Sequence, residues 1–210
     1  MPPAPSRSTF CPGADLRATP EERGGGVLSL DEAYQTATML HDLPQFTIAA
    51  VNGACAGAGL AWASACDYRV ANDRAKFASA FLELGLSGEL GVAWTLIRAL
   101  GATAAREVMF FPSKMTAGDA LRHGFVSRVF EDEGFSGEVE ALVNELASRN
   151  VPAVRLMKQN FLDAERIPLR EFVDAESARQ AVFFSGEAGL QTQRRMADSA
   201  VRNGISGRES

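Results

Sequence analysis

The chain of 210 residues has few of the residues that build metal sites or disulfide frameworks. It contains only two histidines and three cysteines, and Cys11, Cys55 and Cys66 stand at none of the short spacings that bind zinc. An odd number of thiols favours a reducing compartment over a disulfide-stapled secreted fold. The first ten residues also lack the apolar run of a signal peptide. We therefore expect a cytoplasmic protein without a metal site.

Basic residues are too few and too scattered to form a nucleic-acid-binding face. The chain has 21 Lys and Arg against 26 Asp and Glu, which gives a formal net charge of −5. Its one basic doublet, Arg194-Arg195, is isolated, so we expect no nucleic-acid partner. Hydrophobic residues make up 46% and charged residues 22% of the chain, a balance typical of globular domains and not of disordered chains.

No residue is charged from Leu43 to Cys66, a stretch long enough to span a bilayer. It nevertheless contains proline, glutamine, three glycines and the turn-forming pair Asn52-Gly53. Its many alanines would also contribute little to insertion. We interpret the stretch as a buried strand, a tight turn and a buried helix, and we expect no membrane span.

Hydrophobic periodicity predicts strands alternating with helices, followed by helices alone. The capping box Ser29-Leu30-Asp31-Glu32 predicts the first helix start, and Thr116 predicts another. The expected strands are 46–51, 68–71 and 126–130, and the expected helices are 29–41, 58–65, 92–100, 102–111, 116–124, 138–148, 152–165 and 169–184. This order is typical of an α/β core, residues 1–130, with a helical region, residues 131–210.

A run of small residues, Gly53-Ala-Cys-Ala-Gly57-Ala-Gly59, lies between a predicted strand and a predicted helix. The chain has no Gly-Lys-Ser/Thr for a phosphate-binding loop, and Trp62 stands where a dinucleotide fingerprint needs its third glycine. Such a turn can still offer backbone N–H groups at a helix N-terminus to an anion or a developing oxyanion. Close packing of a helix rich in small residues explains it equally well.

Three motifs occur in order along the chain: FCPGADL at 10–16, AAVNGACAGAGLAWASACD at 49–67, and LELGLSGE at 82–89. Together they resemble the crotonase family, the enoyl-CoA hydratases and isomerases. The resemblance implies an α/β fold, a spiral core of ββα units with a C-terminal helical region that builds homotrimers or hexamers. It also implies an acyl-CoA or enoyl-CoA substrate, with coenzyme A entering as part of the substrate and no separate cofactor. Family members carry a block of strands and a helix before the first motif, so this chain is short at its start.

In the family, two backbone N–H groups stabilise the negative charge that develops on the thioester oxygen. Carried over by position, these are the N–H groups of Ala14 and Ala58, each directly after a glycine, Gly13 or Gly57. We expect Asp15 to hold the first turn by accepting hydrogen bonds from nearby N–H groups.

The pair of glutamates that the family's hydratases use would fall at Ala61 and Phe81, so both are absent. Glu89 stands where some isomerases carry an acidic residue that moves the substrate proton. One carboxyl group suffices to shift a double bond, because a proton taken from C2 can be returned at C4. The resemblance therefore favours a double-bond isomerase with Glu89 as the proton shuttle. Its acyl tunnel is expected to be lined by Phe81, Leu82 and Trp94.

Other interpretations stay open on the sequence alone. The protein could bind acyl-CoA without catalysis, or hydrate an enoyl-CoA with Glu89 or Glu83 in an altered arrangement. A nucleotide-binding domain would rest on the glycine cluster alone. Glu89 itself could be a structural charge before a helix, favoured there by the helix dipole.

Overall fold

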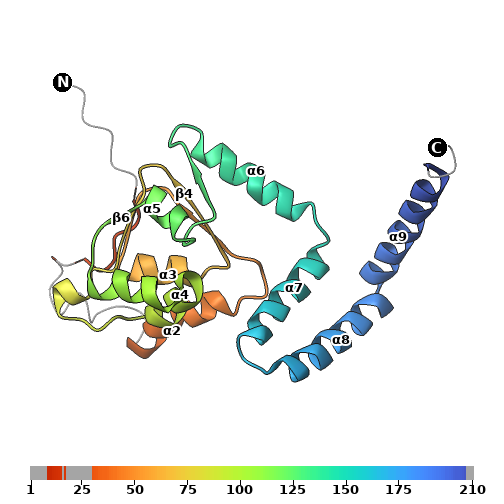
Figure 1. Ribbon diagram of the computed structural model, residues 1–210, viewed down its shortest axis with the longest axis horizontal. Helices are drawn as coiled ribbons and strands as arrows, with labels where there is room; N and C mark the ends of the chain where they lie inside the picture. The colour runs from red at the N-terminus through yellow and green to blue at the C-terminus, as the bar shows by residue number, and fades with distance from the viewer. Residues whose placement is uncertain (1–8, 16, 18–29, 207–210) are drawn as a thin grey trace. The chain divides into compact units, whose positions relative to one another are not determined.

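The structure, a computed structural model, describes residues 9–15, 17 and 30–206 (Figure 1). The capping box predicted at Ser29 lies outside the described residues. The chain divides into two compact units, Met1–Val143 and Asn144–Ser210, which are described separately below. The boundary expected after residue 130 stays a prediction.

The described residues of the first unit form two sheets, and most successive strands lie in different sheets. One has the strand order β1-β3-β5-β6, with β6 antiparallel to β5 and the others parallel; the other has the order β2-β4-β7 and is parallel throughout. The strands are β1 (Thr9–Cys11), β2 (Ile48–Val51), β3 (Ala54–Ala56), β4 (Tyr68–Asn72), β5 (Lys76–Ala78), β6 (Met115–Thr116) and β7 (Arg128–Phe130). Each pair β2-β3 and β4-β5 thus places one strand in each sheet before the chain enters a helix. This is the ββα order expected from the sequence.

The helices of this unit are α2 (Leu30–His41), α3 (Ala58–Ala65), α4 (Val92–Phe110), α5 (Ala117–Arg122) and the short 3₁₀ helix η1 (Leu82–Leu84); α6 (Phe135–Ala147) follows β7. Helix α3 contacts both α2 and α4 (Figure 1). Leu60 and the alanines from Ala61 to Ala65 are buried in a core that also contains Val51, Phe77 and Leu96. The uncharged stretch from 43 to 66 therefore contains the predicted strand, as β2, and the predicted helix, as α3; the short strand β3 between them was not predicted. Among the described residues, no helix is both long and apolar enough to cross a membrane.

A kink divides α4 at Gly101, which has non-helical backbone angles of φ 78° and ψ 162°. Such a positive φ is accessible to glycine at little cost because it has no Cβ. The two halves of the helix correspond to the two helices predicted on either side of this residue.

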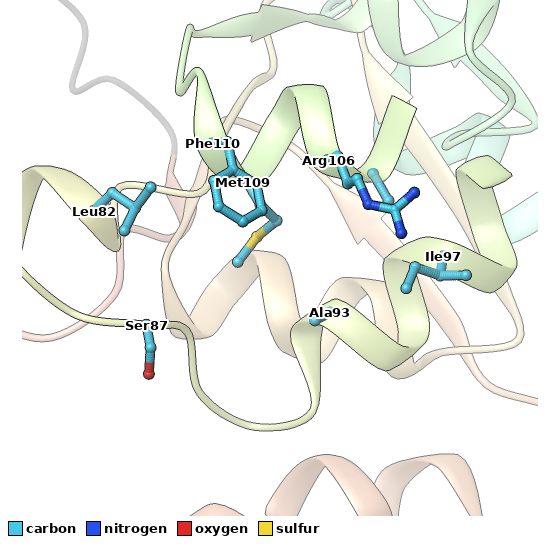
Figure 2. A pocket seen from close by; sticks show the side chains of 8 residues that line it. Leu82, Ser87, Ala93, Ile97, Arg106, Met109 and Phe110 are labelled. Carbon is cyan, nitrogen blue, oxygen red and sulfur yellow. The ribbon is translucent and has the colours of Figure 1, made fainter. Parts of the chain in front are cut away.

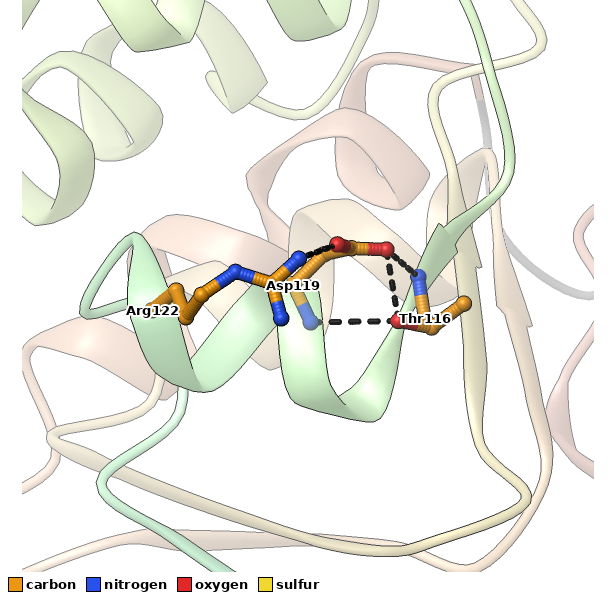
Figure 3. Close-up of polar contacts among 3 residues, drawn as sticks. All are labelled: Thr116, Asp119 and Arg122. Atoms are coloured by element: carbon orange, nitrogen blue, oxygen red, sulfur yellow. Dashed lines mark hydrogen bonds and ion pairs between the residues drawn. The ribbon is translucent and has the colours of Figure 1, made fainter.

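A capping box begins α5, as expected for Thr116 (Figure 3). The N–H and hydroxyl groups of Thr116 donate to Asp119 Oδ2 at 2.9 and 2.5 Å, and Asp119 N–H donates to Thr116 Oγ1 at 3.1 Å. Arg122 pairs with the other carboxylate oxygen. The hydrogen bonds from Thr116, together with the Arg122 charge, lower the pKa of Asp119.

In its described residues, the second unit contains the end of α6 followed by α7 (Val151–Ala164), α8 (Leu169–Ser185) and α9 (Glu187–Ser206), and α8 contacts both α7 and α9. Asn150 caps α7 by accepting a hydrogen bond from Ala153 N–H at 3.1 Å. Arg179 on α8 pairs with Asp163 on α7 at 2.6 Å and donates to Asn160 Oδ1 at 2.9 Å. The exclusively helical end of the chain agrees with the sequence prediction.

Candidate active site

Two glycine turns meet at one edge of the first sheet. Strands β1 and β3 are parallel neighbours, so the turns that follow them, at Gly13 and Gly57, leave the sheet at the same edge. A Cβ atom built on Gly57 would lie 3.7 Å from Gly13 Cα, and one built on Gly13 would lie 3.1 Å from the carbonyl oxygen of Ala56. The φ angles are 92° at Gly13 and 54° at Gly57, which favour glycine at both positions. The two backbones are therefore in van der Waals contact.

The two alanines expected to supply N–H groups follow these glycines directly, so the contact brings them together. Ala58 is the first residue of α3, and its N–H belongs to the helix end whose donors have no partner within the helix. Gly57, at the N-cap, has no side chain that could accept from them. Gly57 N–H is itself bonded to the carbonyl oxygen of Ala78 on β5 at 3.2 Å, which fixes the turn to the sheet.

Gly59 has a different function from Gly57. A Cβ at Gly59 would lie 2.2 Å from the carbonyl oxygen of Cys11, so α3 approaches β1 at a distance that only glycine permits. Close packing, the second interpretation of the glycine run, is therefore correct for this residue. On the neighbouring turn, Asp15 Oδ1 accepts a hydrogen bond from Arg17 N–H at 2.9 Å, which confirms the prediction for Asp15.

Glu89 lies in a strained turn immediately before α4. Gly88, Leu90 and Gly91 around it have φ angles of 106°, 55° and 67°. The left-handed conformation costs a non-glycine residue such as Leu90 about 1–2 kcal/mol, and strain of this kind is concentrated at functional sites. Glu89 is half-buried, whereas Glu83, its rival in the sequence, is exposed on η1.

Tyr34 of α2 and the Glu89 side chain lie near enough to each other for a hydrogen bond between them to affect the pKa of Tyr34. Partial burial raises the pKa of Tyr34, and so do this hydrogen bond and the Glu89 charge. The Tyr34 phenol therefore stays protonated, so that its O–H group can donate a hydrogen bond to the carboxylate. Sequence analysis did not identify Tyr34, because no motif marks it. Its helical spacing from Ala37 and His41 (i, i+3, i+7) was the available signal.

A cavity of about 320 Å³ lies next to this turn (Figure 2). Residues from η1, from the loop before Glu89 and from both halves of α4 line it: Leu82, Ser87, Ala93, Ile97, Ala105, Arg106, Met109 and Phe110. Figure 2 shows Arg106 and Met109 pointing from the second half of α4 toward the first. A Cβ on Gly88 would lie 3.1 Å from Met109 Cε, so this glycine approaches the cavity lining, whereas Glu89 itself is not among the lining residues.

The structure separates the three residues expected to line an acyl tunnel. Leu82 lines the cavity. Phe81 is buried in the core with 3% of its surface exposed and, like Ala61, offers no group that could transfer a proton. Trp94 makes an edge-on contact with His41, with ring centres 5.3 Å apart, and Arg98 stacks on it. Neither Phe81 nor Trp94 is among the residues that line the cavity.

Comparisons with known proteins identify the family. The model of the enoyl-CoA hydratase/isomerase family matches residues 4–195. The chain is 40% identical over 131 residues to the probable enoyl-CoA hydratase echA14 of Mycobacterium tuberculosis, a match covering 59% of this chain and 48% of that protein. It is 31% identical over 172 residues to the 1,2-epoxyphenylacetyl-CoA isomerase of Escherichia coli, covering 80% and 66%.

A solved structure of similar fold belongs to a Thermobifida fusca protein described as an enoyl-CoA hydratase, determined in complex with acetoacetyl-CoA. The two share 27% sequence identity with a TM-score of 0.71 over 74% of this chain and 61% of the other. This likeness confirms the crotonase-like fold. The chain spans about half the length of the mycobacterial relative. With nearly all of its residues matched by the family model, the chain belongs to the enoyl-CoA hydratase/isomerase family.

Proposed function

We propose that the protein shifts the double bond of an enoyl-CoA thioester and that Glu89 carries the proton. The observation that supports this most strongly is the position of Glu89, half-buried in a strained turn whose Gly88 approaches Met109 of the cavity lining. The apolar Ala61 and Phe81 stand where hydratases of the family carry glutamates. A single carboxyl group beside an acyl cavity suits proton transfer between two carbons better than activation of water.

In the proposed reaction, the thioester oxygen accepts hydrogen bonds from the N–H groups of Ala14 and Ala58. The Glu89 carboxylate removes a proton from C2 of a 3-enoyl-CoA, and the electrons of the C2–H bond move toward the thioester oxygen to give a dienolate. Glu89 then returns the proton to C4, so that the C3–C4 double bond becomes a C2–C3 double bond. Atoms and charge balance without water or a separate cofactor, since coenzyme A is part of the substrate.

The two N–H groups would supply much of the rate acceleration. Negative charge develops on the thioester oxygen only as the proton leaves C2, so donors fixed in advance stabilise the transition state more than the substrate. Loss of one such donor costs about 3 kcal/mol in comparable sites. The backbone contact between Gly13 and Gly57 supports this proposal, because it fixes the spacing of the two turns.

We also propose that the protein functions as a cytoplasmic homotrimer or hexamer. Several large apolar side chains of the second unit are exposed: Met157, Phe161, Leu169 and Val182 are between 62% and 77% exposed. Large apolar side chains exposed to this degree are typical of interfaces between copies. Light scattering coupled to size exclusion would measure the assembly, and a monomer would contradict this part of the proposal.

The function is tested by following the ultraviolet absorbance of the conjugated thioester with purified protein. With a 3-enoyl-CoA, an isomerase increases this absorbance. With a 2-enoyl-CoA, a hydratase decreases this absorbance. Hydration is the activity in the name of the mycobacterial relative. Binding of a saturated acyl-CoA without either change would show a protein that binds acyl-CoA without catalysis and would overturn the proposal.

A further inference from the structure

The lining of the cavity contains a single charged side chain, that of Arg106. Of the other seven lining residues, Ser87 has a polar side chain and six are apolar, and three of these, Leu82, Ile97 and Phe110, are 43–64% exposed. A cavity of this composition holds an apolar group and fixes its orientation through its few polar groups. We propose that the cavity takes an acyl chain that ends in a carboxylate and that Arg106 binds this carboxylate. The inference rests on the proposed function, since it names the class of acyl-CoA that the site takes.

Arg106 has N–H donors that the fold does not use. Within the described part of the chain its one hydrogen bond runs from Nη1 to the carbonyl oxygen of Ala102, a helical turn earlier, at 3.4 Å. The residues three and four positions away, where an acidic partner on the same helix would stand, are Ala102, Thr103, Met109 and Phe110. A guanidinium group presents five N–H donors in one plane and pairs with both oxygens of a carboxylate.

The cavity begins close to the edge of the sheet where the two glycine turns lie. Ala56 of β3 is paired with Ala78 of the parallel strand β5, and Gly57 N–H donates to the carbonyl oxygen of Ala78 at 3.2 Å. The segment after β5 therefore leaves the sheet beside the Gly57 turn, and Leu82 on η1 belongs to this segment. A thioester held at the turns can thus extend its chain past Leu82 into the cavity.

Arg106 lies at the far side of the cavity from this entrance. Figure 2 shows Leu82 and Ser87 on one side and Ile97 and Arg106 on the other, with Met109 between them. An extended chain that passes Met109 therefore brings its end, and not its middle, to the guanidinium group.

The chemistry of Arg106 favours a carboxylate over a methyl group at that end. An alkyl chain would cover the guanidinium group with apolar surface and remove water from N–H groups that have no other acceptor, which costs free energy. A terminal carboxylate accepts hydrogen bonds from the same groups. Since Arg106 is exposed, water weakens the ion pair, and we expect a preference of about tenfold, at the lower end of what a hydrogen bond between charged groups contributes.

The test is the Kd, measured by titration calorimetry, of saturated CoA thioesters in pairs of equal carbon number: adipyl-CoA against hexanoyl-CoA, and suberyl-CoA against octanoyl-CoA. We expect the wild type to bind the carboxylate-ended member of at least one pair about tenfold more tightly. Arg106→Gln removes this preference, whereas Arg106→Lys keeps part of it, because the charge remains but the two-pronged geometry is lost. The control is Arg98→Gln, which removes a charge from the first half of α4 outside the cavity lining and keeps the preference.

Equal affinities within both pairs would overturn the inference, and so would a preference that survives in Arg106→Gln or is lost equally in Arg98→Gln. A uniform loss of affinity in Arg106→Gln for all four thioesters and for free coenzyme A would place Arg106 at the coenzyme A phosphates and overturn it as well.

Because binding of a saturated thioester needs no proton transfer, this inference and the proposed function fail separately. Isomerase activity together with equal affinities within both pairs would overturn the carboxylate preference alone. A preference that depends on Arg106 in a protein without isomerase activity would support the carboxylate site and overturn the proposed reaction. No binding of any thioester would overturn both.

Discussion

Gly13 and Gly57 lie back to back: Gly13 Cα is 3.7 Å from the position that a Cβ on Gly57 would take. The residues are 44 positions apart, and the parallel pairing of β1 with β3 joins them. The two short turns thus lie side by side, and Ala14 and Ala58, which supply the two N–H groups, are the next residue in each turn.

The first prediction concerns Gly57→Ala. With φ 54° and ψ −119°, Gly57 has a backbone conformation that strains alanine by about 1–3 kcal/mol, and relief of that strain would move Ala58 N–H. We expect kcat to fall about 100-fold or more, as when one oxyanion donor is lost. Gly124→Ala is the matched control, because Gly124 has a similar φ of 74°, open space around it and no proposed function. Equal activity in the two variants would contradict the proposed function of the turn.

The second prediction concerns stability at Gly59. A Cβ there would lie 2.2 Å from the Cys11 carbonyl oxygen, and neither backbone can give way cheaply. Gly59→Ala should lower the melting temperature by several degrees, as expected for about 1–3 kcal/mol of overpacking. Gly137→Ala in α6 meets nothing within 4 Å and should be neutral or stabilising, since alanine favours a helix interior. Thermal unfolding of both proteins checks the contrast.

Local sequence signals predicted elements well where a single residue decides the outcome. Thr116 has a hydroxyl at a helix start, and it begins α5 by the expected capping box. Gly101 divides α4 because of its positive φ. Neither outcome depends on contacts that are distant in the sequence.

Tertiary contacts are what the sequence did not reveal. The turns at Gly13 and Gly57 were matched to a family pattern, but their contact follows from strand pairing, which one sequence does not encode in any local motif. The partner of Glu89 was missed for the same reason, because 55 residues separate it from Tyr34. The contacts of Trp94, which was expected at an acyl tunnel, with His41 and Arg98 were not predicted either.

A third prediction concerns pH and the pair Asp163–Arg179, whose side chains are only 19% and 21% exposed. Burial by itself would raise the pKa of Asp163, but hydrogen bonds from Gln159 and Arg179 lower it on balance. A carboxylate with a lowered folded-state pKa stabilises the fold above its unfolded pKa of about 3.9, and this stability is lost as pH falls through the folded value.

Asp163→Asn should therefore melt below the wild type at pH 6, and the gap should close below about pH 4. The control is Asp174→Asn, at an exposed position on α8. A gap that does not change with pH would show that packing, and not the charge of Asp163, is responsible.

A fourth prediction concerns the cavity. Ala93→Leu adds three carbons to the first half of α4, opposite Met109. If the cavity takes the acyl chain, kcat/KM should fall several-fold more for a long 3-enoyl-CoA than for a short one. Ala104→Leu on the same helix, outside the cavity lining, is the control. An equal effect on both chain lengths would place the acyl chain elsewhere.

The last prediction tests which carboxylate transfers the proton. Glu83 and Glu89 lie six residues apart, but Glu83 is exposed on η1, whereas Glu89 is half-buried in the turn whose Gly88 approaches Met109 of the cavity lining. Glu89→Gln keeps the shape and the polarity of the side chain and removes its basicity. Isomerisation should fall about 10²- to 10⁴-fold while the Kd for a saturated acyl-CoA stays unchanged. Glu83→Gln should keep full activity. The reverse result would assign the proton transfer to Glu83, and a loss of affinity in Glu89→Gln would show that the carboxylate holds the substrate instead of reacting with it.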